Sequence, residues 1–203
     1  MSLLKKWFHD SRPEIWKQLS AKLGGEYKKG GWGSGDRLEV RHGEWILTLD
    51  TFVVPVGKVM VPMTRLRAPF ANADGFRVGL SRETFLTPLG RLLGMQDIQI
   101  GVREFDDAYV IKGSDERKVR EFLSNAKLRA LLLAEKDAGF TVEDDEGWFG
   151  AKFPEGVDEL RVVWHGHEKD PKRIEHFFEL FSEALDQLCR IGSAYERRVD
   201  VKL

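Results

Sequence analysis

The chain has 203 residues, of which 42% are hydrophobic and 32% charged, and its formal net charge is −1. This composition indicates a globular protein with a sizeable core, and six Trp and thirteen Phe argue against disorder. A nucleic-acid-binding protein would usually carry clustered basic residues and a clear positive charge, so this class is disfavoured. We expect one compact domain over residues 1–203, with 1–96 and 97–203 as candidate sub-lobes.

The cysteine content and the apolar runs bear on the compartment. Cys189 is the single cysteine, so no internal disulfide can form and a reducing compartment is expected. The stretch MSLLKKWFHDSRPE lacks the apolar segment of a secretory signal. No apolar run approaches the roughly 18 residues that indicate a membrane span. We therefore expect a cytoplasmic protein without a membrane span.

The first elements in the chain are a helix and a series of strands. Ser11 and Glu14 form a capping box for a helix that Gly24 and Gly25 end. Four segments with a period of two follow without an intervening helix, which predicts hairpins and an antiparallel sheet: RLEVRHG, WILTLDTFVV, VMVPMTRLRAPF and FRVGLS. WILTLDTFVV is apolar on both faces and predicts a central strand. Pro62 predicts an edge position or a bulge for the third segment.

The remaining elements alternate between strand and helix. Residues 84–96 predict a connector, and DIQIGVREF and AYVIKG predict strands. A helix capped by Ser114 or Asp115 follows, with a kink or restart at Ser124-Asn125. A hairpin that turns between residues 144 and 147, a strand DELRVVWHGH, and a long helix opened by Asp170 and Pro171 complete the order. The predicted fold class is α+β, a largely antiparallel sheet packed against three main helices, and the order allows two similar halves.

The segment EFDDAYVIKGSDERKVREFLSNAKLRALLL, residues 104–133, resembles a pattern in bacterial domains of unknown function. The matching positions are Phe105, Asp106, Tyr109, Val110 and Asp115, and the resemblance extends over residues 97–191. It implies a strand, a capped Leu-rich helix, a strand pair and a closing helix. It implies no activity, so it bears on architecture alone.

Arginines provide the first candidate site. Arg65 and Arg67 alternate on one face of a predicted strand, and Arg41 and Arg77 lie on strands that could be neighbours. Such a basic face could bind a small anionic ligand. The alternative interpretation is the solvated face of an antiparallel sheet, where arginines are common.

Histidines provide the second candidate. In VVWHGHE, His165 and His167 are spaced as a His-x-His pair that strand geometry would place on one side. A metal would need at least a third ligand. The alternative interpretation is a polar strand end before the helix at Asp170.

Motifs for catalysis are otherwise lacking in the sequence. GGWGSGD, residues 30–36, is followed by a strand and contains no Lys-Ser/Thr pair, so it predicts a hairpin loop instead of a phosphate loop. No G-x-S-x-G motif occurs. We therefore predict no catalytic residue and no cofactor. The predicted function is a cytoplasmic, bacterial-type, non-enzymatic binding or interaction domain that recognises a protein, itself or an anionic ligand; the alternative is a hydrolase-like or metal-assisted enzyme.

Overall fold

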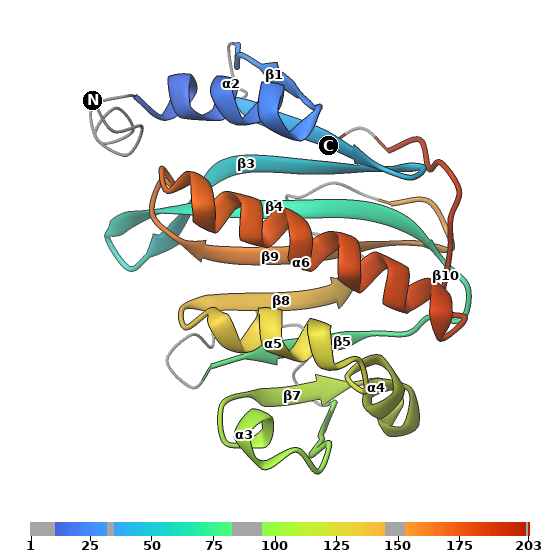
Figure 1. The fold of residues 1–203 in the computed structure, drawn as a ribbon. Helices are drawn as coiled ribbons and strands as arrows, with labels where there is room; N and C mark the ends of the chain where they lie inside the picture. The colour runs from blue at the N-terminus through green and yellow to red at the C-terminus, as the bar shows by residue number, and fades with distance from the viewer. Residues whose placement is uncertain (1–10, 32–34, 83–94, 145–152, 202) are drawn as a thin grey trace.

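The computed structural model describes residues 11–31, 35–82, 95–144, 153–201 and 203. The strands are β1 (Glu26–Lys28), β2 (Arg37–His42), β3 (Trp45–Val56), β4 (Val59–Asn72), β5 (Val78–Ser81), β6 (Gln96–Asp97), β7 (Val110–Gly113), β8 (Ala138–Glu143), β9 (Val157–His165) and β10 (Ala194–Tyr195). The helices are α2 (Arg12–Leu23), α3 (Arg103–Asp106), α4 (Glu116–Phe122), α5 (Ala126–Ala134) and α6 (Pro171–Arg190). The fold is α+β with a large antiparallel sheet, as predicted (Figure 1).

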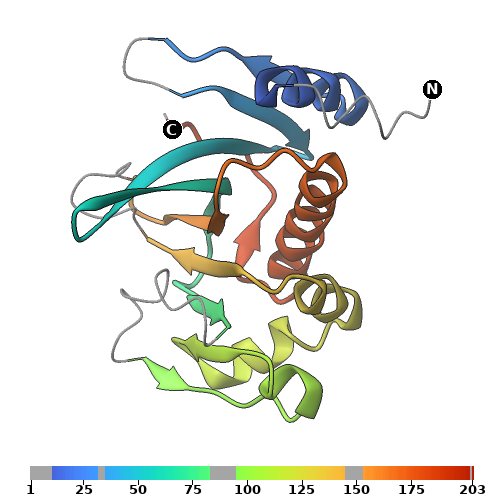
Figure 2. The ribbon, with the colours of Figure 1, turned by 90° about the vertical axis from the view of Figure 1, so that its left-hand side faces the viewer.

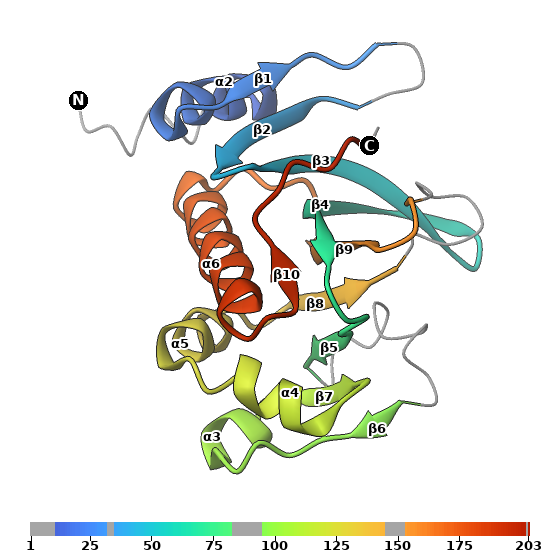
Figure 3. The same ribbon diagram turned by 90° about the vertical axis from the view of Figure 1, so that its right-hand side faces the viewer.

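All strands belong to one sheet of order β1-β2-β3-β4-β9-β8-β5-β7-β6, and β10 pairs with β4. Every pair in it is antiparallel. The order follows the chain from β1 to β4 and then departs from it. The next neighbour of β4 is β9, and β5 lies between β8 and β7 on the far side (Figure 3). Strands from both ends of the chain are therefore interleaved in one sheet.

The helices α2, α5 and α6 lie on one side of the sheet (Figure 2). The strongly amphipathic α6 buries its apolar stripe there, including Ile174, Phe177 and Phe181, each fully buried. Trp164 of β9 stacks on Phe177 with ring centroids 4.1 Å apart. The main core therefore lies between α6 and the middle of the sheet. No helix among the described residues is long and apolar enough to cross a membrane.

The predicted helix starts are confirmed by their caps. The Glu14 carboxylate accepts a hydrogen bond from the backbone N of Ser11 at 2.7 Å, and Gly24 ends α2 with φ of 66°. Asp115 caps α4, and the predicted restart occurs where Asn125 caps α5. Asp170 caps α6, as its position before Pro171 indicates.

Two local predictions are wrong. The segment DIQIGVREF is not one strand, because β6 ends at Asp97 and α3 begins at Arg103. The Asp106 carboxylate accepts hydrogen bonds from the backbone N of Ile100 and Gly101, both at 2.8 Å. These two backbone N–H groups are therefore used in a local turn. They are not available for hydrogen bonds to a neighbouring strand. The predicted connector at 84–96 lies almost wholly outside the described residues.

The prediction of an edge position or a bulge from Pro62 is also wrong, since β4 lies between β3 and β9 and its register with β3 is uninterrupted at Pro62. Pairing of β4 with β9 begins only at Met63, opposite His165. Pro62 lies just beyond that pair and needs no N–H there. Its carbonyl accepts a hydrogen bond from the backbone N of Gly166 at 2.8 Å. A central strand thus tolerates this proline because the neighbouring strand has already ended.

Candidate functional site

The sheet face opposite the helices carries a set of charged side chains that we call the charged face. Its members come from β3, β4, β8 and β9: Asp50, Arg65, Arg67, Glu143, Glu159 and Arg161. Alternation along the strands places them there, because Leu49, Leu66, Val142, Leu160 and Val162 point into the main core. Arg67, Glu143 and Glu159 are buried. Three arginines and three acids leave this face without net charge.

Asp50 is the acceptor that brings two of the predicted arginines together. Its Oδ1 accepts from Arg65 Nε at 2.6 Å, and its Oδ2 accepts from Arg67 Nη2 at 2.6 Å. Arg65 also lies over the ring of Phe52, 4.9 Å from the centroid. An anion bound by these two guanidinium groups would have to displace the carboxylate of Asp50.

Like charges face each other directly in the register of the charged face. Arg67 is opposite Arg161 across β4 and β9, and Glu143 is opposite Glu159 across β8 and β9. Such pairs are unfavourable by themselves. Here Arg67 is paired with Asp50, while Glu143 accepts from Arg161 and from the Thr141 hydroxyl. Arg65 and Arg67 are therefore paired with Asp50, and Arg161 is paired with Glu143, across neighbouring strands.

The other two predicted arginines lie apart from this pair. Arg41 is exposed on β2, opposite Ile46. Arg77 precedes β5 and donates from Nη2 to Asp144 Oδ2 at 2.6 Å. The structure thus brings Arg65 and Arg67 together but does not gather all four arginines at one point.

The two histidines lie in different surroundings. His165 is the last residue of β9 and is opposite Met63, on the side of the charged face. His167 lies past the strand end, where its Nδ1 is 3.1 Å from Arg12 Nη1 of α2. Because arginine only donates, this Nδ1 must accept and is occupied by that contact. Within the described residues, no group of three or more His, Cys, Asp or Glu side chains could hold a metal ion.

The positive surroundings of His167 affect its titration. Burial lowers the pKa of His167, and the positive charges of Arg12 and Lys169 lower it further. The imidazole of His167 therefore stays neutral to a lower pH than the ordinary histidine pKa would allow.

Sequence reasoning missed the most unusual surface feature, the end of the β3–β4 hairpin. We call residues 53–62 the ribbon. Of the large hydrophobic side chains that the described chain exposes, four lie here: Val53 (53% exposed), Val56 (57%), Val59 (64%) and Met60 (58%). The ribbon projects past the end of the sheet and bends away from the helices (Figures 1 and 2). Its sequence, VVPVGKVMVP, is apolar and extends across the ends of two predicted strand segments, so it gives no sign of exposure.

Pairing within the ribbon is regular up to its turn. Val56 is opposite Val59 across a two-residue turn in which Gly57 has φ of 61°, as a type II′ turn requires at its first position. β2 pairs with β3 only as far as Leu49, and β9 pairs with β4 only from Met63. The ribbon is thus a two-stranded element whose outer edges have no strand beside them in the described chain.

Comparisons with known proteins bear on the fold. No protein-family model matches the chain, and no curated protein matches it. Among solved structures, the crystal structure of the mycobacterial trehalose monomycolate transport factor A, TtfA, is similar, with a TM-score of 0.51 and 9% sequence identity. The similarity covers 91% of this chain and 97% of that chain. At this identity the likeness concerns the fold alone.

Proposed function

We propose that this chain is a non-enzymatic binding domain and that the ribbon is its contact surface. The observation that carries the proposal is the exposure of Val53, Val56, Val59 and Met60 on one projecting element. Monomeric proteins rarely expose several large apolar side chains together on one projecting element, and where they do it usually marks an interaction site.

The charged face supports a binding role because its charge pairs hold the strands that carry the ribbon in place. Asp50 accepts from both Arg65 and Arg67, and Glu143 accepts from Arg161. Such charge pairs between neighbouring strands help to fix the register of the strands that carry them. β3 and β4, which form the ribbon, are thereby held in place at the ribbon's base. TtfA is named as a transport factor and not as an enzyme, and the proposal agrees with that description.

The test compares the native chain with a variant in which Val56 and Val59 are both replaced by Glu. The control is Ile46→Glu, an equivalent change at an exposed position near the other end of β3. Light scattering after size exclusion measures self-association, and retention from a native lysate, membranes included, measures other partners. We expect the ribbon variant to lose association that the control keeps. Identical mass and identical retained material for all three proteins would refute the proposal.

A further inference from the structure

The two faces of the ribbon limit the kinds of partner that can cover it. Strand alternation places Val53, Pro55, Met60 and Pro62 on the side toward the helix layer and a second set on the opposite side. That second set is also apolar: Val54 and Val61 are half-buried against Met63 and Val163, and Val56 and Val59 are exposed. A flat protein surface would cover one face and leave the other in water. An apolar medium that surrounds the ribbon would cover both.

The backbone edges of the ribbon argue against a partner strand. Because Val56 and Val59 close the two-residue turn, they exchange hydrogen bonds with each other, and the next pair along, Pro55 with Met60, points its backbone groups outward. The same holds for Val53 with Pro62, whose carbonyl indeed bonds outward to Gly166 N. On each outer edge of the ribbon, a proline therefore stands where an added strand would need a backbone N–H donor. Prolines in such positions block strand addition, whether by a second copy or by a peptide.

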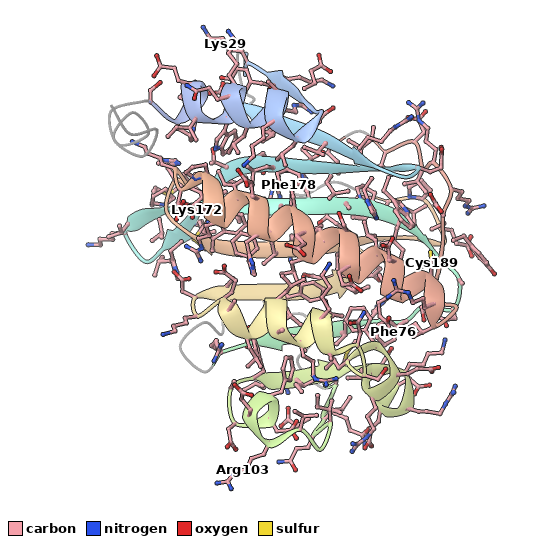
Figure 4. All side chains as sticks on the ribbon, in the orientation of Figure 1. Lys29, Phe76, Arg103, Lys172, Phe178 and Cys189 are labelled. Carbon is pink, nitrogen blue, oxygen red and sulfur yellow. The ribbon has the colours of Figure 1, made fainter. Side chains whose placement is uncertain are left out.

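Positive side chains gather at the same end of the molecule. The turn from Gly166 to Glu168 is fastened to the ribbon's base, because Thr64 Oγ1 donates to the Gly166 carbonyl and accepts from the backbone N of Glu168. Lys169 follows directly, and Lys172 lies at the start of α6 at this end (Figure 4). Lys58 lies in the turn of the ribbon itself.

These lysines differ from the acids beside them. Glu168 accepts from Trp164 Nε1 and Arg173, and Asp170 caps α6. Lys58, Lys169 and Lys172 are exposed and make no ion pair with any residue that the structure describes. The acids at this end are therefore engaged internally, while the lysines remain available to an anionic surface.

From these observations we infer that the ribbon docks this chain onto a lipid bilayer surface that contains anionic headgroups. The inference rests on the proposed function and names its partner. The four residues of each ribbon strand extend about 13 Å, which is enough to reach the boundary between headgroups and acyl chains and far short of the roughly 30 Å hydrocarbon core. Oblique, shallow insertion keeps the outward carbonyls hydrated and lets the long Lys58 side chain place its ammonium group at the phosphates.

Vesicle flotation tests the inference with the full chain. The vesicles are phosphatidylcholine alone or phosphatidylcholine mixed with phosphatidylglycerol. We expect the native chain to float with the anionic vesicles, and the Val56→Glu/Val59→Glu variant to lose at least about tenfold in partitioning. Ile46→Glu should float like the native chain. Circular dichroism confirms that each variant is folded.

A second variant tests the charge contribution. Replacing Lys58, Lys169 and Lys172 together by Gln should weaken binding to anionic vesicles on the order of a hundredfold, because each lysine near such a surface contributes about fivefold. Lys17→Gln, an exposed position on α2, is the control and should have no such effect.

The outcomes separate the inference from the proposed function. A native chain that does not float, or a ribbon variant that floats equally well, overturns the bilayer as partner. If vesicle binding is absent but the ribbon variant still loses self-association or a retained protein, the binding function stands with a different partner. If the ribbon variant changes none of these measurements, both the inference and the proposed function fall.

Discussion

Replacing Asp50 by Asn is the most direct perturbation of the charged face. The Asp50 carboxylate holds Arg65 and Arg67, and the side chain of Asp50 is only 13% exposed. Asparagine has nearly the same shape as aspartate, so the change removes the negative charge of Asp50 and little else. The guanidinium groups of Arg65 and Arg67 then lack this carboxylate. The side chain of Arg67 is 5% exposed and that of Arg65 is 16% exposed, so neither can turn into water without local rearrangement.

The expected cost follows from these contacts. Removing one partner of a buried ion pair usually costs about 3–5 kcal/mol, since the remaining charge is left uncompensated. Arg65 is the more accessible of the two arginines and can regain some hydration. We therefore expect a loss of about 3 kcal/mol in the free energy of unfolding. For a chain of this length that loss lowers the melting temperature by roughly 6–12 °C.

Urea unfolding followed by circular dichroism measures this loss. The matched control is Asp107→Asn, because Asp107 pairs with Arg103 in an exposed i,i+4 arrangement at 3.5 Å. The control should change the free energy of unfolding by less than about 0.5 kcal/mol. A cost below about 1 kcal/mol for Asp50→Asn would mean that water reaches both guanidinium groups. The charged face would then be open to solutes, which would favour ligand binding by Arg65 and Arg67.

Three further predictions concern single residues. Asn125→Ala should cost about 1–2 kcal/mol in urea unfolding, because Asn125 caps α5 and its amide also donates to Glu183 of α6 at 2.6 Å. Because the pKa of His167 is lowered in the folded chain, the unfolded chain takes up this proton at a higher pH than the folded chain does. The free energy of unfolding should therefore decrease as pH falls below about 6.5. His167→Gln should reduce this decrease when unfolding is measured at high and low pH. Burial raises the pKa of Asp158, so its ionisation disfavours the fold above the ordinary carboxyl pKa. Asp158→Asn should therefore be more stable relative to the native chain at neutral pH than at acid pH, and an unchanged difference between the two pH values would contradict this.

Local features of the fold could be predicted from the sequence because they depend on neighbouring residues. Caps at Ser11, Asp115 and Asp170 act within one helical turn, and the apolar stripe of α6 repeats at helical spacing. The antiparallel character of the sheet follows equally from consecutive strands with short connections. The pairing of β4 with β9 could not be predicted in this way, since it joins distant parts of the chain and alternation gives no partner.

The surface features were hidden for a different physical reason. Alternation distinguishes polar from apolar positions, but it does not measure exposure. The segment WILTLDTFVV is apolar on both faces and reads as a buried central strand, although its last two residues and the rest of β3 belong to the exposed ribbon. Arg67 conversely was compatible with a solvated face, although it is buried in the charged face. In each case the exposure of a residue depends on which strand, if any, lies beside it in the sheet. Alternation along one strand does not identify that neighbour.

The interleaved strand order affects how the chain is made. β1 to β4 pair with their neighbours in sequence and can form while the chain leaves the ribosome, whereas β4 receives β9 only after about 90 further residues have been added. At typical synthesis rates this takes about 5–20 s, during which the outer edge of β4 is exposed to other nascent chains. β5 is likewise made long before β8 and β7, its two neighbours. We therefore expect productive folding in the cell to depend on protection of that edge, by a chaperone or by slow release, until residue 165 has been synthesised.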